Sequence, residues 1–207
     1  MTDANNFHNQ YNSYQFPAHI RVVQVAGWGS PTVKAVEYKN NHGIPGYRTL
    51  FTVEGDKTVV YPSAVLSTTA DETYYFNLAV YNALESIPDS QHRDLLNASP
   101  IKQIVKDVIK KEEVSENSFI KTIKPDPGSV ENKLVVSTYS PVILGAYDQL
   151  GNFTGVDPNQ DLSADILSVK EDIPGSTFLY TSESQNIFLP KEGNYNFIYK
   201  GIGNGPT

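Results

Sequence analysis

The stretch that decides the fold is Ile20-Arg21-Val22-Val23-Gln24-Val25-Ala26, which ends at Gly27-Trp28-Gly29. It is rich in β-branched residues and nearly continuous in apolar character, as expected of a strand covered on both faces. Strands of this kind belong to sheets that carry helices on both sides. The sequence therefore predicts an α/β layer around this strand.

The segments that follow extend this α/β pattern as far as residue 112. Further strands are predicted at Tyr47–Val53 and Thr73–Val80. Ser99-Pro100 then reads as a helix N-cap followed by proline at the first helical position. An apolar stripe at helical spacing continues from there: Ile101, Ile104, Val105, Val108 and Ile109.

The second part of the chain has a different pattern. Short β-type runs alternate with turn residues at spacings of about 8–12 residues, which is typical of an all-β sandwich. We expect residues 1–112 to be part of an α/β domain, 113–132 a linker and lead-in, and 133–207 a small immunoglobulin-like sandwich. The predicted strands are 133–137, 142–147, 177–181, 186–189 and 195–199.

Composition excludes several classes of function. The 207 residues carry a formal net charge of −7, which gives no general attraction to nucleic acid or to anionic membranes. Most of that charge, −6, falls in residues 113–207, where 6 Lys and 12 Asp+Glu stand, against −1 in residues 1–112. There is no cysteine, so disulfides, zinc–thiolate sites and thiol nucleophiles are excluded. No apolar run is long enough to suggest a membrane span, and the N-terminus lacks a signal-peptide pattern.

Two polar residues stand where α/β proteins place their chemistry. Asp56 directly follows a predicted strand, and His92 lies between the next strand and the last helix. An acid that orients a histidine and stabilises its protonated form is what nucleophilic hydrolysis needs behind its serine. The non-catalytic alternatives are that Asp56 belongs to a Gly-Asp turn and that His92 caps a helix. If the catalytic interpretation holds, an Asp56 oxygen and His92 Nδ1 should lie within hydrogen-bond reach.

Three local sequences carry a family resemblance. Gly55-Asp56-Lys57-Thr58-Val59-Val60-Tyr61-Pro62-Ser63-Ala64 resembles the segment around the acid of lipase-like α/β-hydrolases of the lecithin:cholesterol acyltransferase and inositol-deacylase-like group. Val23 to Thr32 resembles the strand before that acid, and Gln91 to Asn97 the histidine loop. The resemblance runs from about Phe7 to Ile109. It implies that Asp56 and His92 are the acid and the general base of a Ser-His-Asp triad that cleaves lipid or other acyl esters.

The sequence departs from that family at two points. No Gly-x-Ser-x-Gly elbow is present, and Ser30, in Gly27-Trp28-Gly29-Ser30-Pro31, is misplaced relative to the glycines. We therefore expect the chain to be the carboxyl-terminal part of a longer hydrolase, inactive alone, whose upstream part holds the serine; a separate polypeptide supplying the elbow is the less economical alternative. Lys57 also stands where the family usually has glycine.

The β part has a resemblance of its own. Ser140 to Gly155, Ile173 to Ser176 and Gly193 to Phe197 are similar to a β-sandwich module appended to secreted prokaryotic hydrolases and surface proteins. This similarity covers about residues 134–206 and implies an extracellular or cell-surface location. The alternative function is a non-catalytic adhesion or carbohydrate-binding protein with a hydrolase-like remnant.

Two further features allow either a functional or a purely structural interpretation. The alternation of Asp157, Asn159, Asp161 and Asp165 resembles a calcium loop, but the glycine and the closing glutamate of such loops are absent. A solvated acidic loop is therefore favoured, and no cofactor is expected. Trp28 and Tyr74-Tyr75-Phe76 could line an acyl pocket, although aromatic side chains on strands more often belong to the core.

Overall fold

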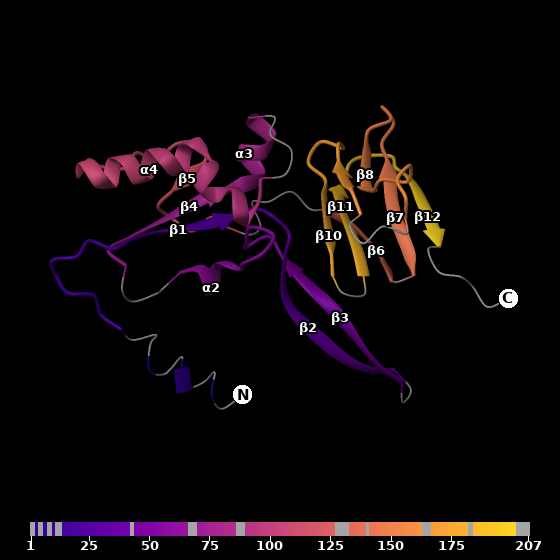
Figure 1. Cartoon of the computed structure of the whole chain (residues 1–207), viewed down its shortest axis with the longest axis horizontal. Coiled ribbons are helices and arrows are strands. Elements are labelled where there is room, and N and C mark those ends of the chain that lie inside the picture. Colours follow the sequence, from indigo (N-terminus) through magenta and orange to yellow (C-terminus); the bar gives the residue numbers. More distant parts are fainter. Residues whose placement is uncertain are drawn as a thin grey trace. The chain divides into compact units, whose positions relative to one another are not determined.

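The computed structural model describes residues 3, 6, 7, 10, 14–41, 44–65, 70–85, 90–126, 133–139, 141–162, 167–181 and 184–201, with the backbone alone at 41, 44 and 45. The chain forms two compact units. One comprises Met1–Tyr81 and Ser90–Pro127, and the other Asn82–Asp89 and Gly128–Thr207. The described part is predominantly β, with 43% strand and 20% helix, so the α/β expectation for the first half covers only part of what forms (Figure 1).

A three-stranded sheet organises the first unit. Its order is β1 (Val23–Trp28), β4 (Glu72–Asn77) and β5 (Ile120–Lys121). β1 and β4 run parallel with Val25 opposite Tyr74, and β5 is antiparallel to β4. β5 lies within residues 113–132, the segment expected as a linker and lead-in, because Val114 and Ile120 bury their side chains in the first unit's core.

The helices follow β4 along the chain: α3 (Leu78–Leu84), a 3₁₀ helix η1 (His92–Asn97) and α4 (Ser99–Lys110). The residue that caps α4 is Ala98, not the predicted Ser99. Ile101 and Ile104 of the predicted stripe are buried against β4, whereas Val105 and Ile109 are exposed. No helix in the described ranges is long and apolar enough to span a membrane.

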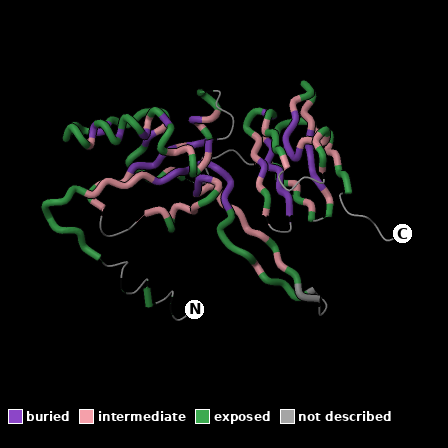
Figure 2. The backbone as a smooth tube through the Cα atoms, viewed as in Figure 1, coloured by how far each residue is buried: buried purple, intermediate pink, exposed green. Residues whose placement is uncertain are grey.

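The predicted strand Tyr47–Val53 forms, but in a different place. It is β3 (Ile44–Thr52), which within the described ranges pairs only with β2 (Thr32–Asn41), in a separate antiparallel ribbon. We call this ribbon the β2–β3 arm. It extends away from the sheet of β1, β4 and β5 (Figure 1). Most β2 residues are exposed and most described β3 side chains are half-buried, whereas the last three residues of β1 and the middle of β4 are buried (Figure 2).

The second unit is a β-sandwich of two antiparallel sheets. One sheet has the order β10 (Thr177–Tyr180), β11 (Ser184–Pro190) and β6 (Lys133–Tyr139); the other has β12 (Asn196–Gly201), β7 (Val142–Tyr147), β8 (Phe153–Val156) and β9 (Val169–Glu171). β8 and β9 are strands that the sequence analysis missed. The shared core contains eight buried residues: Ile143, Leu144, Ala146, Val156, Ile173, Phe178, Ile187 and Leu189.

Candidate active site

Asp56 lies beside the carboxyl end of β1, the strand that decides the fold. After β1 the chain passes through the β2–β3 arm and returns, so that Asp56 forms an isolated parallel bridge with Ser30. Gly29 N–H donates to the Val53 carbonyl at 2.9 Å and Ser30 N–H to that of Gly55 at 3.0 Å. These backbone bonds hold the acid loop at the end of the sheet.

Asp56 fits there because Gly27 has no side chain. A Cβ atom on Gly27 would lie 2.5 Å from Asp56 Cβ and 3.0 Å from Oδ2. These distances are too short for non-bonded atoms, so any larger residue at position 27 would displace the carboxylate. Gly27, the residue before the last in β1, therefore leaves room for the acid.

The Asp56 carboxylate is 2% exposed, and its hydrogen bonds compensate for its burial. Oδ1 accepts the backbone N–H groups of Thr58 at 3.2 Å and Val59 at 2.8 Å. Oδ2 lies 2.8 Å from His92 Nδ1. Because an ionised carboxylate can only accept, Nδ1 carries the proton in this contact, and Nε2 is left as the basic nitrogen.

His92 is positioned by the turn that begins η1. Its backbone N–H donates to the Asp56 carbonyl at 3.0 Å, so the two residues are joined by main chain as well as side chain. The preceding Gln91 caps η1 in a reciprocal box with Asp94. Within the described residues, Asp56 is the only side-chain partner of the imidazole, which is 48% exposed.

This geometry meets the expectation for the acid and the histidine. The structure brings Asp56 and His92 into contact across 36 residues of sequence. One side chain is buried and fixed while the other reaches solvent, which is the arrangement that an orienting acid and a proton-transferring base require. Their catalytic roles remain predictions.

The acid loop contains a left-handed residue. Lys57 has φ 74°, a conformation that glycine adopts without strain and lysine does not. Its backbone N–H donates to Thr32 Oγ1 at 2.9 Å, and that hydroxyl in turn donates to the Ser30 carbonyl at 2.9 Å. Thr32, fully buried at the base of the β2–β3 arm, thus links the arm to the loop, a role the sequence analysis did not find.

Ser30 does not occupy a nucleophile elbow. Such an elbow joins a strand to a helix and exposes its serine, whereas Ser30 joins β1 to β2 and is only 5% exposed. Its pairing with Asp56 also places it beside the acid. Ser30 is thus a residue of the backbone connection between β1 and β2.

The aromatic residues near the site pack closely together. Trp28 and Phe76 are fully buried and Tyr75 is 7% exposed. The Tyr61 ring, in the short helix α2 (Tyr61–Ala64), contacts Trp28 edge-on at 6.3 Å and Tyr75 at 5.5 Å between centroids. Burial raises the pKa of Tyr75 to about 12. These positions favour the core interpretation over an acyl pocket.

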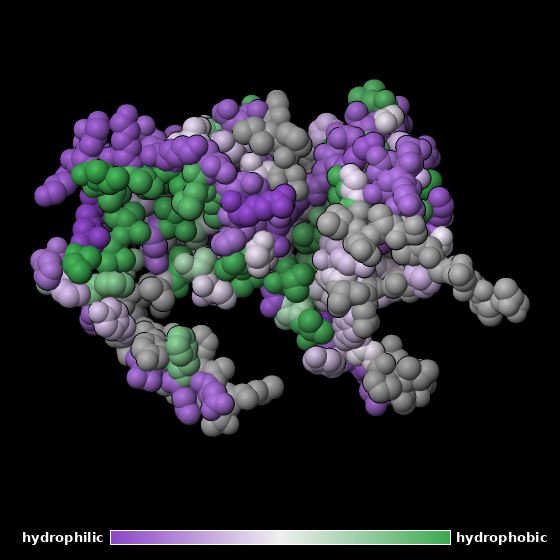
Figure 3. All heavy atoms as spheres, viewed as in Figure 1, coloured by the Kyte–Doolittle hydropathy of each residue, from purple (hydrophilic) through white to green (hydrophobic). Residues whose placement is uncertain are grey.

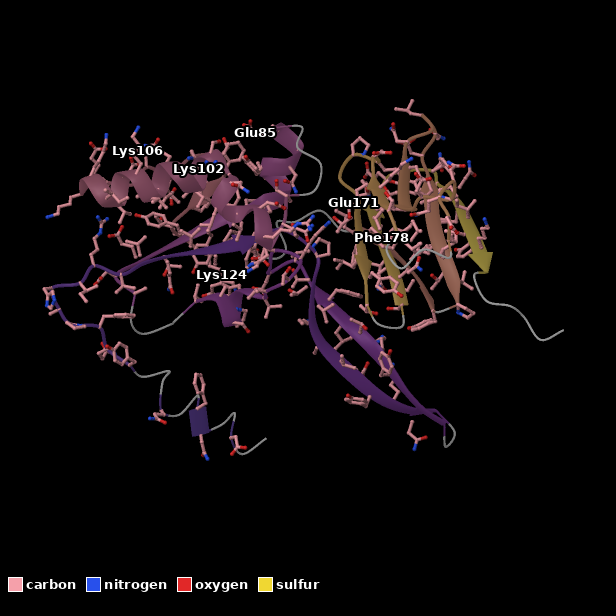
Figure 4. The ribbon with its side chains drawn as sticks, in the orientation of Figure 1. Glu85, Lys102, Lys106, Lys124, Glu171 and Phe178 are labelled. Atoms are coloured by element: carbon pink, nitrogen blue, oxygen red, sulfur yellow. The ribbon has the colours of Figure 1, made fainter. Side chains whose placement is uncertain are left out.

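Lys124 also joins this aromatic cluster, and the sequence analysis missed it. It lies beside α2 (Figure 4), with Nζ 4.8 Å from the Tyr61 ring centroid and 5.6 Å from that of Trp28. It also pairs with Glu54, two residues before the acid. The residues after β5 are therefore tied to the acid loop.

In the acidic loop of the second unit, Asp157 forms an ion pair with a lysine of the same chain. Lys170 Nζ lies 2.7 Å from Asp157 Oδ2, and this hydrogen bond lowers the pKa of Asp157. Asp157 Oδ1 also accepts the Asn159 N–H at 3.0 Å. Asp165 lies outside the described residues, and among those described no three acidic or histidine side chains are grouped to hold a metal ion. Asp161 is described, but it forms no such group.

Comparison with models of protein families, with curated proteins and with solved structures finds no match to this chain.

Proposed function

We propose that this chain supplies the acid and the histidine of a serine-dependent acyl-ester hydrolase, with a β-sandwich as an accessory module. Asp56 is the acid and His92 the general base. The nucleophilic serine and the oxyanion hole belong to a part of the hydrolase outside these 207 residues. The substrate class is an ester of a lipid or a similar acyl compound, and the accessory module is immunoglobulin-like and extracellular.

One observation carries the proposal: the 2.8 Å contact between His92 Nδ1 and Asp56 Oδ2, with Asp56 2% exposed and the His92 side chain 48% exposed. A structural ion pair would need no such asymmetry. The buried carboxylate is already fixed by two backbone N–H groups, so it can hold the imidazole without moving. The exposed side of the ring is then available to a reacting group.

The proton transfers follow from this arrangement. Nε2 accepts the proton of the serine hydroxyl as its oxygen attacks the ester carbonyl, and Asp56 stabilises the imidazolium that forms. His92 then returns the proton to the leaving alcohol, which leaves an acyl-enzyme. In the second half a water molecule gives its proton to Nε2 and its oxygen to the acyl carbon, and His92 returns the proton to the serine.

The order of elements supports the same proposal. In the parallel pair of β1 and β4, the acid loop returns from the β2–β3 arm to lie beside the carboxyl end of β1, and the histidine follows β4 and α3 along the chain. Ligand sites of open α/β sheets lie at the carboxyl ends of such strands. A closing helix, α4, then packs on the sheet.

Fluorophosphonate labelling tests the proposal. The upstream coding sequence is expressed together with these 207 residues, and the 207-residue chain is expressed alone as the matched control. We expect the longer protein to be labelled at a serine upstream of Met1 and the shorter chain to remain unlabelled. His92→Ala in the longer protein should abolish labelling.

Two outcomes contradict the proposal. One is an upstream sequence with no strand ending in Gly-x-Ser-x-Gly, and the other is labelling that His92→Ala leaves unchanged. Either result would favour a non-catalytic surface protein that carries a hydrolase-like remnant.

A further inference from the structure

The strand β1 has one edge that no strand covers within the described part of the chain. The sheet order is β1, β4 and β5, so β1 lies at one end. The Val22 carbonyl accepts the N–H groups of Asp71 at 2.9 Å and of Glu72, the first residue of β4, at 3.3 Å. Val22 therefore directs its backbone groups towards β4, and the residues that alternate with it direct theirs away. Those residues are Val23, Val25 and Gly27, whose backbone N–H and C=O groups we call the outer edge of β1.

The outer edge ends at the acid loop. Gly29 is the next residue in the same alternation, and its N–H donates to the Val53 carbonyl at 2.9 Å. The chain that returns from the β2–β3 arm to Asp56 therefore lies at the carboxyl end of this edge. Along residues 23–27 the edge has no such neighbour in the ranges that the structure describes.

β1 lacks the features that protect an edge strand from pairing. Edge strands of natural proteins are usually short, charged, bulged or interrupted by proline. β1 is six residues long, contains no charged residue or proline, and keeps a regular register with β4. At the opposite end of the sheet, β5 has only two residues, one of them Lys121. An uncharged strand with an uncovered edge suits one kind of ligand, an extended chain that pairs with its backbone.

Apolar side chains beside this edge also remain exposed. Val105 and Ile109 belong to the apolar stripe of α4 but are 48% and 75% exposed. Val23 and Val25 pack against the core cluster to which α4 contributes, and they are only half-buried. Figure 3 shows apolar atoms at the surface between α4 and β1. Contiguous exposed apolar surface marks an interaction site, so a partner on the outer edge can also contact α4.

The position of the edge identifies its partner. A strand that pairs with residues 23–27 has one of its ends beside the acid loop, where Asp56 and His92 make contact. The proposed function requires a nucleophile from a part of the hydrolase outside these 207 residues. We propose that a strand of this upstream part pairs with the outer edge of β1 and that its side chains pack against Val105 and Ile109. The inference rests on the proposed function for the source of the strand.

Amide hydrogen exchange, measured by NMR, tests the inference. The protein expressed with its upstream coding sequence is compared with the 207-residue chain. We expect the Val23 and Val25 amides to exchange at least about 100-fold more slowly in the longer protein, because their N–H groups gain acceptors. The Gln24 and Ala26 amides face β4 and serve as internal controls, since they should be protected in both proteins.

Matched substitutions of two exposed isoleucines test the contact with α4. Ile109→Glu should lower the thermal midpoint of the longer protein by about 4 °C or more and leave that of the 207-residue chain nearly unchanged. The control is Ile123→Glu, at an isoleucine that is 79% exposed and follows β5 along the chain. It should have little effect in either protein.

The inference is overturned if the Val23 and Val25 amides exchange equally fast in both proteins, or if Ile109→Glu is as mild as Ile123→Glu in the longer protein. Protection that falls when the longer protein is diluted would also overturn it, because it would assign the edge to a second copy. Fluorophosphonate labelling separates this inference from the proposed function. Labelling without protection contradicts the inference alone, and protection without labelling contradicts the catalytic proposal alone.

Discussion

At the scale of single residues, the site depends on a glycine. Gly27→Ala would place a methyl group 2.5 Å from Asp56 Cβ, so the carboxylate must move and its contact with His92 must lengthen. We expect a loss of about 1–3 kcal/mol in the free energy of unfolding, typical of overpacking. Nitrogen-detected NMR of the imidazole should show the Nδ1–H tautomer in the unmodified chain and a mixture of tautomers in the variant.

The control for this prediction is Gly151→Ala, at a turn where an added Cβ meets nothing within 4 Å, although φ is +85°. That variant carries backbone strain without disturbing the site. It should therefore lose stability but keep the Nδ1–H tautomer. An unchanged tautomer in both variants would show that Gly27 does not position the acid.

The strain at Lys57 gives a second residue-scale prediction. Because its φ of 74° suits glycine, Lys57→Gly should raise the free energy of unfolding by about 0.5–1 kcal/mol, after the greater flexibility of glycine in the unfolded chain is counted. Lys57→Ala keeps the strain and serves as the control in urea unfolding. Equal stabilities of the glycine and alanine variants would mean that the loop is not held in this conformation.

At the scale of elements, a charged cluster joins the starts of β1 and β4. Arg21 Nε donates to Glu72 Oε1 at 2.6 Å, and the Tyr74 hydroxyl donates to Oε2 at 2.6 Å. The bond from Arg21, followed by that from Tyr74, lowers the pKa of Glu72. A lowered pKa stabilises the fold above the unfolded-state value of about 4.3, and this stabilisation is lost as the pH falls through the folded-state pKa.

Glu72→Gln should therefore lower the free energy of unfolding by about 0.5–1 kcal/mol at neutral pH, a value kept small because the pair is about one-third exposed. Urea unfolding across pH measures it, and the difference from the unmodified chain should shrink as the pH falls below about 4.3 and vanish once it is below the lowered folded-state pKa. A difference that persists at acidic pH would assign the effect to packing.

The strands also show what could and could not be predicted from the sequence. Runs of β-branched and aromatic residues mark β1 and β4, and the last three residues of β1 and the middle of β4 are buried. Tyr47–Val53 has the same local character, and nothing in it distinguishes a sheet strand from the arm strand β3, because pairing partners are set by distant residues. β8 escaped notice because two of its four buried residues are a threonine and a glycine, whose burial is set by their surroundings and not by their own hydrophobicity.

In the candidate site, too, some residues could be predicted from the sequence and others could not. Asp56 and His92 could be predicted because each stands in a recognisable local sequence after a strand. Thr32 and Lys124 could not, because each reaches the acid loop from a part of the chain more than 20 residues away and has no local pattern of its own. The left-handed backbone at Lys57 likewise follows from the loop's hydrogen bonds, not from the lysine.

At the scale of the whole molecule, the first unit holds the Asp56–His92 pair and the β2–β3 arm, and the second unit is a β-sandwich. The net charge of −7 does not show how the charges are arranged, for example that Lys39 and Arg48 of the arm both pair with Glu37. The sum of charges describes the chain as a whole, and binding depends on the charges within one Debye length.

The central claim is that His92 is the general base and that Asp56 orients it and stabilises its protonated form, and kcat/KM for a soluble short-chain ester tests it most directly. The protein is expressed with its upstream coding sequence, and His92→Ala and Asp56→Asn are compared with Tyr199→Glu as the control. We expect losses of about 10⁴-fold or more for the first variant and about 10³–10⁴-fold for the second, with thermal midpoints that show both to be folded. A folded His92→Ala variant that retains activity would contradict the account.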